Sequence, residues 1–199
     1  MAKCNNFKEP SSLYQTIVFL TLTEQKIETL LALCQKGNQL AQLEVYNRYH
    51  KAMYNTAFRI LKHSAEAEDI MQESFITAFE KLDSFKGTAT FGAWLKRIVI
   101  NNSIVQFRKN QKFTQLPEYE VPEIAEEISQ DTEDYSALQS AEILQTMDSL
   151  HPNYKTILTL HFIEGYDYEE IGEILQISYG NCRTMISRAK ESLRKKLCV

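Results

Sequence analysis

The sequence has few of the residues that form tight turns, with six glycines and four prolines among 199 residues. A fold of many short strands needs more turns than this, so a β-rich fold is disfavoured. Long segments instead carry apolar residues at every third or fourth position, which predicts an all-α protein. The length allows one or two domains.

Cysteine, histidine and long apolar runs are also scarce. The four cysteines form no C-x-x-C pair, and the four histidines have no metal-ligand spacing, so we expect reduced thiols, no metal and no cofactor. No run reaches membrane-spanning length. The apolar stretch from Leu13 to Leu22 contains Tyr, Gln and Thr, and no A-x-A site follows it. We therefore expect a cytoplasmic protein without membrane insertion.

No nucleophile–base pair and no phosphate-binding glycine loop is evident, which argues against an enzyme. The net charge is −4, but residues 117–142 hold nine acidic residues and neither Lys nor Arg. The rest of the chain therefore carries +5, and local charge matters more for nucleic-acid binding than the total.

The segment 64–82 has the pattern of an acidic amphipathic helix, with Ser64 as its expected N-cap and carboxylates in its first turn. Its apolar residues share one face, which we expect to be buried: Met71, Phe75, Ala78, Phe79 and Leu82. Polar residues share the opposite face: Glu66, Asp69, Glu73, Thr77 and Glu80. This face is either simply solvated or binds a basic partner.

The next segment has the opposite charge. Residues 83–90 read as a loop, and a helix follows with an apolar stripe at Phe91, Trp94, Leu95 and Ile98. Between residues 86 and 112 there are six basic residues and no acidic one. An acidic helix followed by a basic, aromatic helix indicates two different ligands.

The remaining helices are bounded by clear signals. We expect one helix from a Thr23 cap to about Lys36, a stop at Gly37-Asn38, and a helix from about Gln39 to Leu61. The many aromatics of the latter could line a ligand pocket, but at helical spacing its apolar residues are expected in the core: Leu43, Tyr46, Tyr49, Met53, Tyr54, Ala57 and Ile60.

A second helical domain is expected to begin near Ser140. Its first helix is lined by Leu144, Met147 and Leu150, and its second runs from Pro152 through Phe162 to Gly165. Asp167 should cap a helix over 168–175, and Ser178 should cap a final helix to about Leu197. The last two helices have the pattern of a helix-turn-helix. We expect Cys182, Ile186, Ala189, Leu193 and Leu197 to face inward.

Several motifs occur together: AEDIMQESF, then FxxWLxRIxxN, then the helix-turn-helix LHPNYKTILTLHFIEGYDYEEIGEILQIS. In this order and spacing they resemble the sigma-70 family of bacterial transcription initiation factors, and more narrowly its extracytoplasmic-function (ECF) group. The resemblance covers roughly residues 25–112 and 140–197. It implies a sigma factor that binds core RNA polymerase and directs promoter-specific transcription initiation by recognising the −35 and −10 elements and helping to melt the −10 region.

The resemblance also implies where each ligand binds. The residues that correspond to the polymerase-binding motif, on the β′ clamp helices, are Glu66, Asp69, Gln72 and Glu73. The candidates for the melted −10 strand are Phe85, Lys86, Lys96, Arg97, Asn101, Asn102, Arg108 and Lys109, whereas Phe91 and Trp94 fit the core better. The candidates for the −35 element are Tyr179, Arg183, Thr184, Ser187 and Arg188.

The sequence departs from the family pattern at four of its positions. Val105 stands where the family often has Asp, and Met185 where it often has Arg. Gln176 replaces the usual turn Gly, and Gly172 replaces Ala within a helix. The first two bear on base preference, and the last two on backbone strain.

The expected organisation is therefore two small helical domains, sigma regions 2 and 4, on an acidic linker. The boundaries are an N-terminal extension (1–23), region 2 (24–112), the linker (113–139) and region 4 (140–199). The linker is either a solvated tether, a nucleic-acid mimic or a shield for the basic helices. Expected partners are core RNA polymerase, through the β′ clamp helices and the β flap, promoter DNA, and an anti-sigma factor, which is common in this group. A stand-alone helix-turn-helix regulator and a purely protein-binding adaptor are the alternatives.

Overall fold

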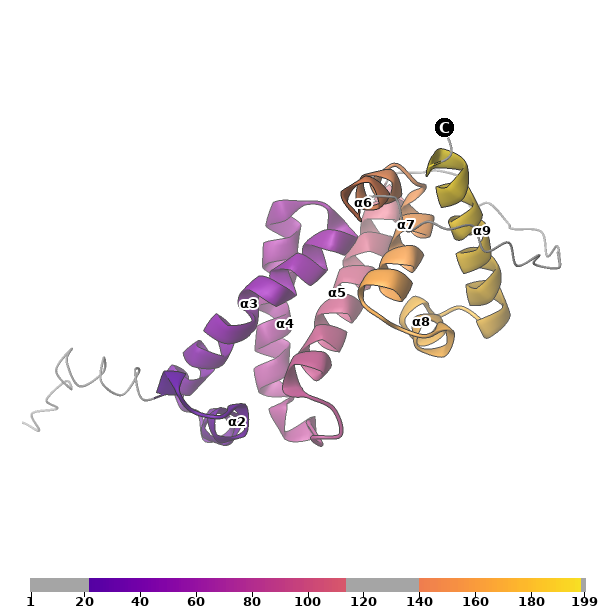
Figure 1. Ribbon diagram of the computed structural model, residues 1–199. Coiled ribbons are helices and arrows are strands. Elements are labelled where there is room, and N and C mark those ends of the chain that lie inside the picture. The colour runs from indigo at the N-terminus through magenta and orange to yellow at the C-terminus, as the bar shows by residue number, and fades with distance from the viewer. Residues whose placement is uncertain (1–21, 114–139, 198–199) are drawn as a thin grey trace, which may run out of the picture. The chain divides into compact units, whose positions relative to one another are not determined.

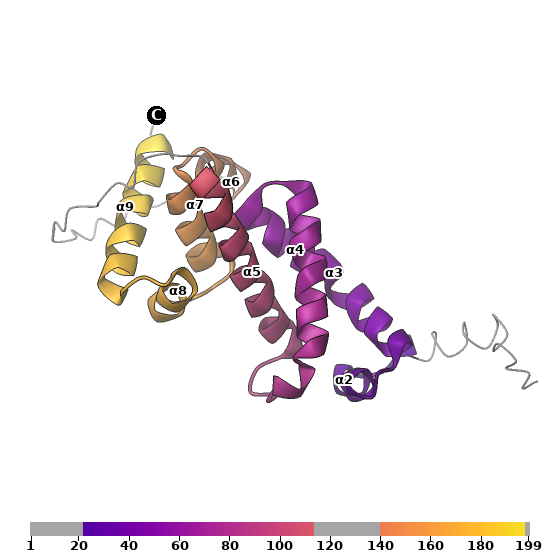
Figure 2. The same ribbon diagram turned by 180° about the vertical axis from the view of Figure 1, so that it is seen from behind.

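The computed structural model describes residues 22–113 and 140–197, in which the regular structure is helical and no strand occurs. The chain divides into two compact units at Ser103–Ile104, a boundary that falls inside helix α5. The helices of each unit are labelled in Figure 1 and seen from behind in Figure 2. Almost all of the expected N-terminal extension and acidic linker lies outside the described residues, and these two segments stay predictions.

The first unit begins with α2 (Ile27–Gln35), which starts later than the sequence indicated. Thr23 was expected to cap this helix, but its N-cap is Lys26, because Thr23 itself has helical conformation and Lys26 is the extended residue before the first turn. The predicted stop at Gly37-Asn38 is confirmed. Gly37 adopts a φ of 78°, which favours glycine, and its N–H bonds the carbonyl of Cys34 at 2.9 Å.

Helix α3 (Gln39–Leu61) has the predicted bounds, and the Asn38 side chain caps it by accepting the N–H of Ala41 at 3.0 Å. Helix α4 (Ser64–Glu80) lies beside α3 in both views (Figures 1 and 2). The expected Ser64 cap is wrong. His63 has the extended backbone of an N-cap, and its Nδ1 accepts the N–H of Glu66 at 3.3 Å.

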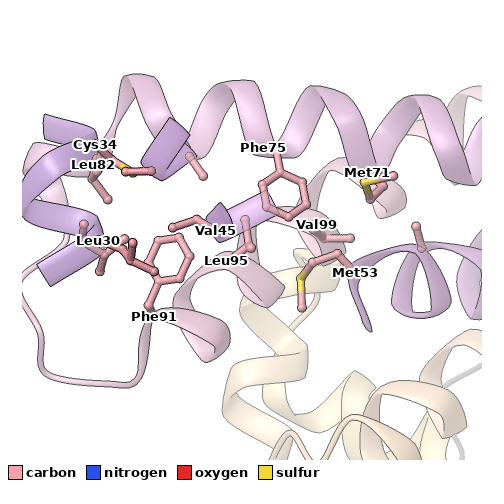
Figure 3. Close-up of a cluster of buried hydrophobic side chains, with 14 of the residues drawn as sticks. Leu30, Cys34, Val45, Met53, Met71, Phe75, Leu82, Phe91, Leu95 and Val99 are labelled. Atoms are coloured by element: carbon pink, nitrogen blue, oxygen red, sulfur yellow. The ribbon is translucent and has the colours of Figure 1, made fainter. Parts of the chain in front are cut away.

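A short 3-10 turn, η1 (Leu82–Ser84), follows α4, and the part of α5 (Phe91–Phe113) up to Ser103 completes the unit. Figure 3 shows side chains from these helices meeting in one cluster, with Phe75 of α4 pointing toward Val45, Leu95 and Val99. The predicted inner face of α4 is confirmed, since Met71, Phe75, Ala78 and Leu82 are buried and Phe79 packs against them. The prediction that Leu43 belongs to the core is wrong, because it lies on the outer side of α3 and is 47% exposed.

One arginine of α3 pairs with a carboxylate of the same helix and also joins the helix to the residues that precede α2. Glu44 is only 3% exposed, and Arg48 Nε donates to its Oε1 at 2.7 Å. The other guanidinium nitrogens of Arg48 donate to the carbonyls of Leu22, Thr23 and Gln25 at 2.8–3.1 Å. Because five N–H groups point from one rigid fork, a single side chain neutralises Glu44 and holds this segment on α3.

The second unit contains α6 (Ser140–Asp148), α7 (Pro152–Leu158), η3 (Thr159–Ile163), α8 (Tyr168–Leu175) and α9 (Tyr179–Leu197). Its buried side chains come from all five elements and include Met147, Leu150, Ile157, Leu160, Ile171, Cys182 and Ile186. Two large apolar residues of these helices lie at the surface, since Leu144 is 49% and Phe162 is 55% exposed.

The exposure of Phe162 has a local cause. The segment 152–163 is one continuous helix, but its last part, Thr159–Ile163, is a π-helix. A π-helix has more residues per turn than an α-helix, so the side chains that follow point in a different direction. Phe162 is thereby turned outward, and Lys190 Nζ of α9 lies 5.1 Å from the centroid of its ring. This helix ends as predicted at Gly165, whose φ is 81°.

Candidate partner-binding and nucleic-acid surfaces

The outer face of α4 presents the polar residues that the sequence assigned to a protein partner. Asp69, Gln72 and Glu73 are exposed and Glu66 is partly exposed, whereas the opposite side of the helix is in the core. Gln72 Nε2 lies 3.4 Å from Glu68 Oε1, so one end of this face is ordered by a contact within the helix. The result is a rigid row of carboxylates and amides that is open to a partner.

The same face also carries a residue that sequence analysis did not select. Ile76 is 59% exposed and lies one helical turn from Gln72, Glu73 and Glu80. Helical spacing alone places Ile76 on this face, between Glu73 and Glu80. The polar residues around it dominate the sequence pattern, so the pattern does not mark Ile76 as a binding residue.

The loop before α5 is supported by an aromatic cluster. Phe85 is partly buried, and its ring centroid lies 5.8 Å from that of Phe91 and 5.3 Å from that of Trp94. Phe91 is 3% exposed and Trp94 is partly buried, so the prediction that both belong to the core is confirmed. Lys86 is exposed beside this cluster. Phe85 therefore has less free ring surface than the sequence suggested, although part of it is accessible.

The polar residues of α5 fall into two groups. Lys96 and Arg97 are partly exposed, and Asn101 and Lys109 are exposed. Asn102 is partly buried, and its Nδ2 donates to Ser74 Oγ of α4 at 3.0 Å, while Ser74 Oγ donates to the carbonyl of Ile70. Asn102 is therefore already used in joining two helices.

Arg108 lies at the end of α5 that belongs to the second unit. Its Nη2 donates to the carbonyl of Leu175, and its Nη1 lies 3.4 Å from Gln176 Oε1. Both acceptors are in the turn that follows α8. In this structure Arg108 thus supports that turn, so binding DNA through its guanidinium requires at least one of these contacts to open.

Helices α8 and α9 have the geometry of a helix-turn-helix. The predicted Asp167 cap is confirmed as a capping box, in which Asp167 Oδ1 accepts the N–H of Glu170 at 2.8 Å and Glu170 Oε2 accepts the N–H of Asp167 at 3.0 Å. Ser178 caps α9 as predicted, with its Oγ 3.3 Å from the nitrogen of Asn181.

The turn contains two of the departures from the family pattern, and it accounts for the one at Gly172. Gln176 takes the left-handed conformation with a φ of 51°, a region that an L side chain enters at a cost. The next N–H, that of Ile177, bonds the carbonyl of Gly172 at 3.0 Å. A Cβ at Gly172 would lie 3.1 Å from the carbonyl oxygen of Ile177, so glycine fits this close turn better than alanine.

Helix α9 divides cleanly into two sides. Cys182, Ile186, Ala189 and Leu193 are buried, as predicted, and Leu197 is partly buried. Burial raises the pKa of the Cys182 thiol, with the charge of Asp167 acting in the same direction. Tyr179 and Arg183 are exposed, whereas Thr184, Ser187 and Arg188 are partly exposed.

Not every basic residue of α9 is equally available. Lys190 lies over Phe162, Lys195 pairs with Glu191 at 2.6 Å, and Lys196 donates to the carbonyl of Ser149 at 2.7 Å. Arg183, at the N-terminal end of the helix, is exposed. An exposed cation therefore stands at the end of α9 that enters a major groove in helix-turn-helix proteins.

Within residues 22–113 and 140–197, no helix contains a segment that is long and apolar enough to cross a bilayer. The same residues bring no three His, Cys, Asp or Glu side chains close enough together to hold a metal ion.

Comparison with known proteins identifies both units. Residues 45–113 match the family model of Sigma-70 region 2, and residues 140–193 match that of Sigma-70, region 4. The chain is 32% identical over 188 residues to the ECF RNA polymerase sigma factor SigW of Bacillus subtilis, covering 87% of this chain and 98% of that protein. It is 30% identical over 188 residues to the ECF RNA polymerase sigma-E factor of Escherichia coli, covering 88% and 95%.

The fold agrees with a solved structure. The sigma factor RpoE of Bartonella quintana, in complex with the anti-sigma factor NepR, matches with a TM-score of 0.52 at 23% identity, covering 78% of this chain and 96% of that chain. Two helical units that match regions 2 and 4 define a sigma-70 protein. With relatives of this identity and coverage, the chain belongs to the ECF group of that family, and its role is that of a sigma factor in transcription initiation.

Proposed function

We propose that the chain binds core RNA polymerase through the outer face of α4 and directs it to promoters whose −35 and −10 elements it recognises. The α8–α9 helix-turn-helix reads the −35 duplex. Helix α5 and the loop before it hold the opened −10 strand. The polymerase carries out RNA synthesis, and the sigma factor supplies binding and positioning.

The observation that carries this proposal is the distribution of charge over helix faces. Asp69 and Glu73 stand exposed on α4 with the apolar side of the helix buried, so they are available to a basic partner. Charges at the rim of an interface mainly set the association rate and the register of binding. The β′ clamp helices are the partner that the family relationship supports.

The −35 assignment rests on the open end of α9. Arg183 is exposed there, and Arg188, five residues further along the helix, is partly exposed. An arginine that forms a bidentate pair with guanine O6 and N7 contributes about 1–3 kcal/mol of discrimination between bases. Thr184 Oγ1 donates to the carbonyl of Gly180 at 3.0 Å, so its methyl group and the acceptor lone pairs of Oγ1 remain for a base contact.

The −10 assignment rests on the aromatic loop and the basic side of α5. Flipping a base costs a few kcal/mol, and stacking on an aromatic ring returns about 1–3 kcal/mol per base. Phe85 offers such a ring, held in place by Phe91 and Trp94. Lys86, Asn101 and Lys109 are exposed and supply phosphate or base-edge contacts.

The test is transcription by purified core RNA polymerase together with this chain. The template is a promoter selected from a library of genomic DNA fragments. The Asp69→Lys/Glu73→Lys variant should lose polymerase binding and transcription. The Glu24→Lys/Glu28→Lys variant changes net charge equally at exposed positions elsewhere in the first unit and should retain both. Tight binding to promoter duplexes without polymerase, with no transcription, would instead support a stand-alone regulator.

A further inference from the structure

Ile76 is the most exposed of the large hydrophobic side chains in the described parts of the chain, with 59% of its surface accessible. A single exposed apolar residue is ordinary on a protein surface. Ile76 differs in its place, because its neighbours one turn away on the outer face of α4 are Gln72, Glu73 and Glu80.

The fold gains little from isoleucine at this position. The core side of α4 is formed by Ala67, Ile70, Met71, Phe75 and Ala78, and the side chain of Ile76 points away from it. A β-branched residue is also a poorer helix former than Ala, Glu or Lys, any of which suits an exposed helix position better. Folding therefore offers no reason for isoleucine here, whereas binding does.

We propose that Ile76 is the apolar centre of the α4 interface, and that its occupant is an exposed helix of core RNA polymerase with a basic rim around an apolar patch. This inference rests on the proposed function and adds the residue that holds the partner once it has docked. The carboxylates around Ile76 require positive charge at the rim of the partner surface. Ile76 requires an apolar patch at the centre of that surface.

The arrangement follows the anatomy of stable interfaces. A dry apolar centre surrounded by polar groups that exclude water carries most of the binding free energy, and the rim contributes specificity. Ile76 has Glu73 on one side along the helix and Glu80 on the other, so a partner that pairs with both covers it completely. A partner that bound only through charge would leave Ile76 in water.

The two kinds of residue then control different rate constants. Asp69 and Glu73 attract the partner over a distance, so they set the association rate and its dependence on salt. Ile76 acts only after contact, so it sets the dissociation rate, and screening by salt does not weaken its contribution. This difference separates an apolar centre from a merely electrostatic surface.

The test measures association and dissociation of the full chain with purified core RNA polymerase over a salt series. Ile76→Ala should raise the dissociation rate by roughly ten- to fifty-fold, from the apolar area no longer buried, with little change in association rate or salt slope. Ile76→Leu should stay within a few-fold of wild type. Asp69→Asn should instead lower the association rate and the salt slope.

The matched control is Leu43→Ala, which removes a 47% exposed aliphatic side chain from α3 and should leave both rates unchanged. The melting temperature of Ile76→Ala should equal or slightly exceed that of wild type, which separates lost binding from lost folding. A dissociation rate unaffected by Ile76→Ala, with wild-type binding intact, would overturn this inference alone. Failure of the wild-type chain to bind polymerase would overturn the proposed function.

Discussion

The Arg48–Glu44 pair gives the sharpest prediction about the first unit. Arg48→Met keeps a long apolar stem on α3 but removes the positive charge beside Glu44. Glu44 is 3% exposed and has its carboxylate 2.7 Å from Arg48 Nε, so the variant leaves a buried negative charge without its partner. The carbonyls of Leu22, Thr23 and Gln25 also lose their donors.

The expected cost follows from these two losses. Removing one partner of a buried ion pair destabilises a protein by about 3–5 kcal/mol, because the remaining charge is uncompensated. The contacts of Arg48 to Thr23 and Gln25 are exposed, so water replaces those hydrogen bonds and adds little to the cost. A small domain has only about 5–15 kcal/mol of stability, so Arg48→Met should remove a large part of it.

Urea unfolding of the full chain tests this prediction. The single tryptophan, Trp94, lies in α5 within the first unit, so its fluorescence follows the unit that contains Arg48. The double variant Glu44→Leu/Arg48→Met should recover most of the loss, because it removes both charges. Lys51→Met, at an exposed position of α3, is the control. A loss below about 1 kcal/mol for Arg48→Met, the size of a surface pair, would refute the reasoning.

Three further predictions concern the second unit and the thiol of Cys34. Arg183→Ala and Arg188→Ala should each weaken −35 recognition by the holoenzyme by about 1–3 kcal/mol and reduce its salt slope by about one, measured with labelled promoter duplexes; an unchanged promoter profile contradicts the assignment. Gln176→Gly should raise the free energy of unfolding by about 0.5–1 kcal/mol in thermal melts, since glycine adopts the positive φ at less cost, and a loss of stability counts against strain there. Burial raises the pKa of Cys34 to about 11. An unfolded cysteine thiol has a pKa of about 8.5, so between that pH and 11 the unfolded state loses this proton while the folded state keeps it. The free energy of unfolding should therefore fall as the pH rises over this range. Cys34→Ala removes the thiol and should make this fall shallower.

The parts of the fold that sequence alone predicted are those with local causes. Helix α3 begins after Asn38 and ends at Leu61 as expected, because a capping side chain and an interrupted apolar repeat define those ends. The inner faces of α4 and α9 were also predicted, since their apolar residues follow the helical repeat without a break. The Asp167–Glu170 capping box needs only residues three positions apart.

The errors have causes that a local pattern does not contain. His63 replaces Ser64 as the cap of α4 because its ring nitrogen reaches the same N–H, a role that sequence rules seldom assign to histidine. The π turn at Thr159–Ile163 rotates Phe162 outward, which no constant helical repeat anticipates. Leu43 has the right spacing, but no helix among residues 22–113 covers its side of α3.

In the candidate sites, too, the features set by local spacing were predictable, and those that depend on helix packing were not. The acidic face of α4 follows from helical spacing, so the sequence predicted that Asp69, Gln72 and Glu73 would be exposed. The partner of Asn102 is Ser74, 28 residues away, and it becomes visible only when α4 and α5 pack together. The exposure of Ile76 likewise depends on how the other helices pack, because none of the described elements covers that face of α4.

The most direct test of the account is run-off transcription from a genomic promoter library by purified core RNA polymerase with and without this chain. We predict promoter-specific transcripts that require the chain and that disappear with the Asp69→Lys/Glu73→Lys variant but persist with Glu24→Lys/Glu28→Lys. The absence of any chain-dependent transcript, or equal transcription by both charge-reversal variants, would contradict it.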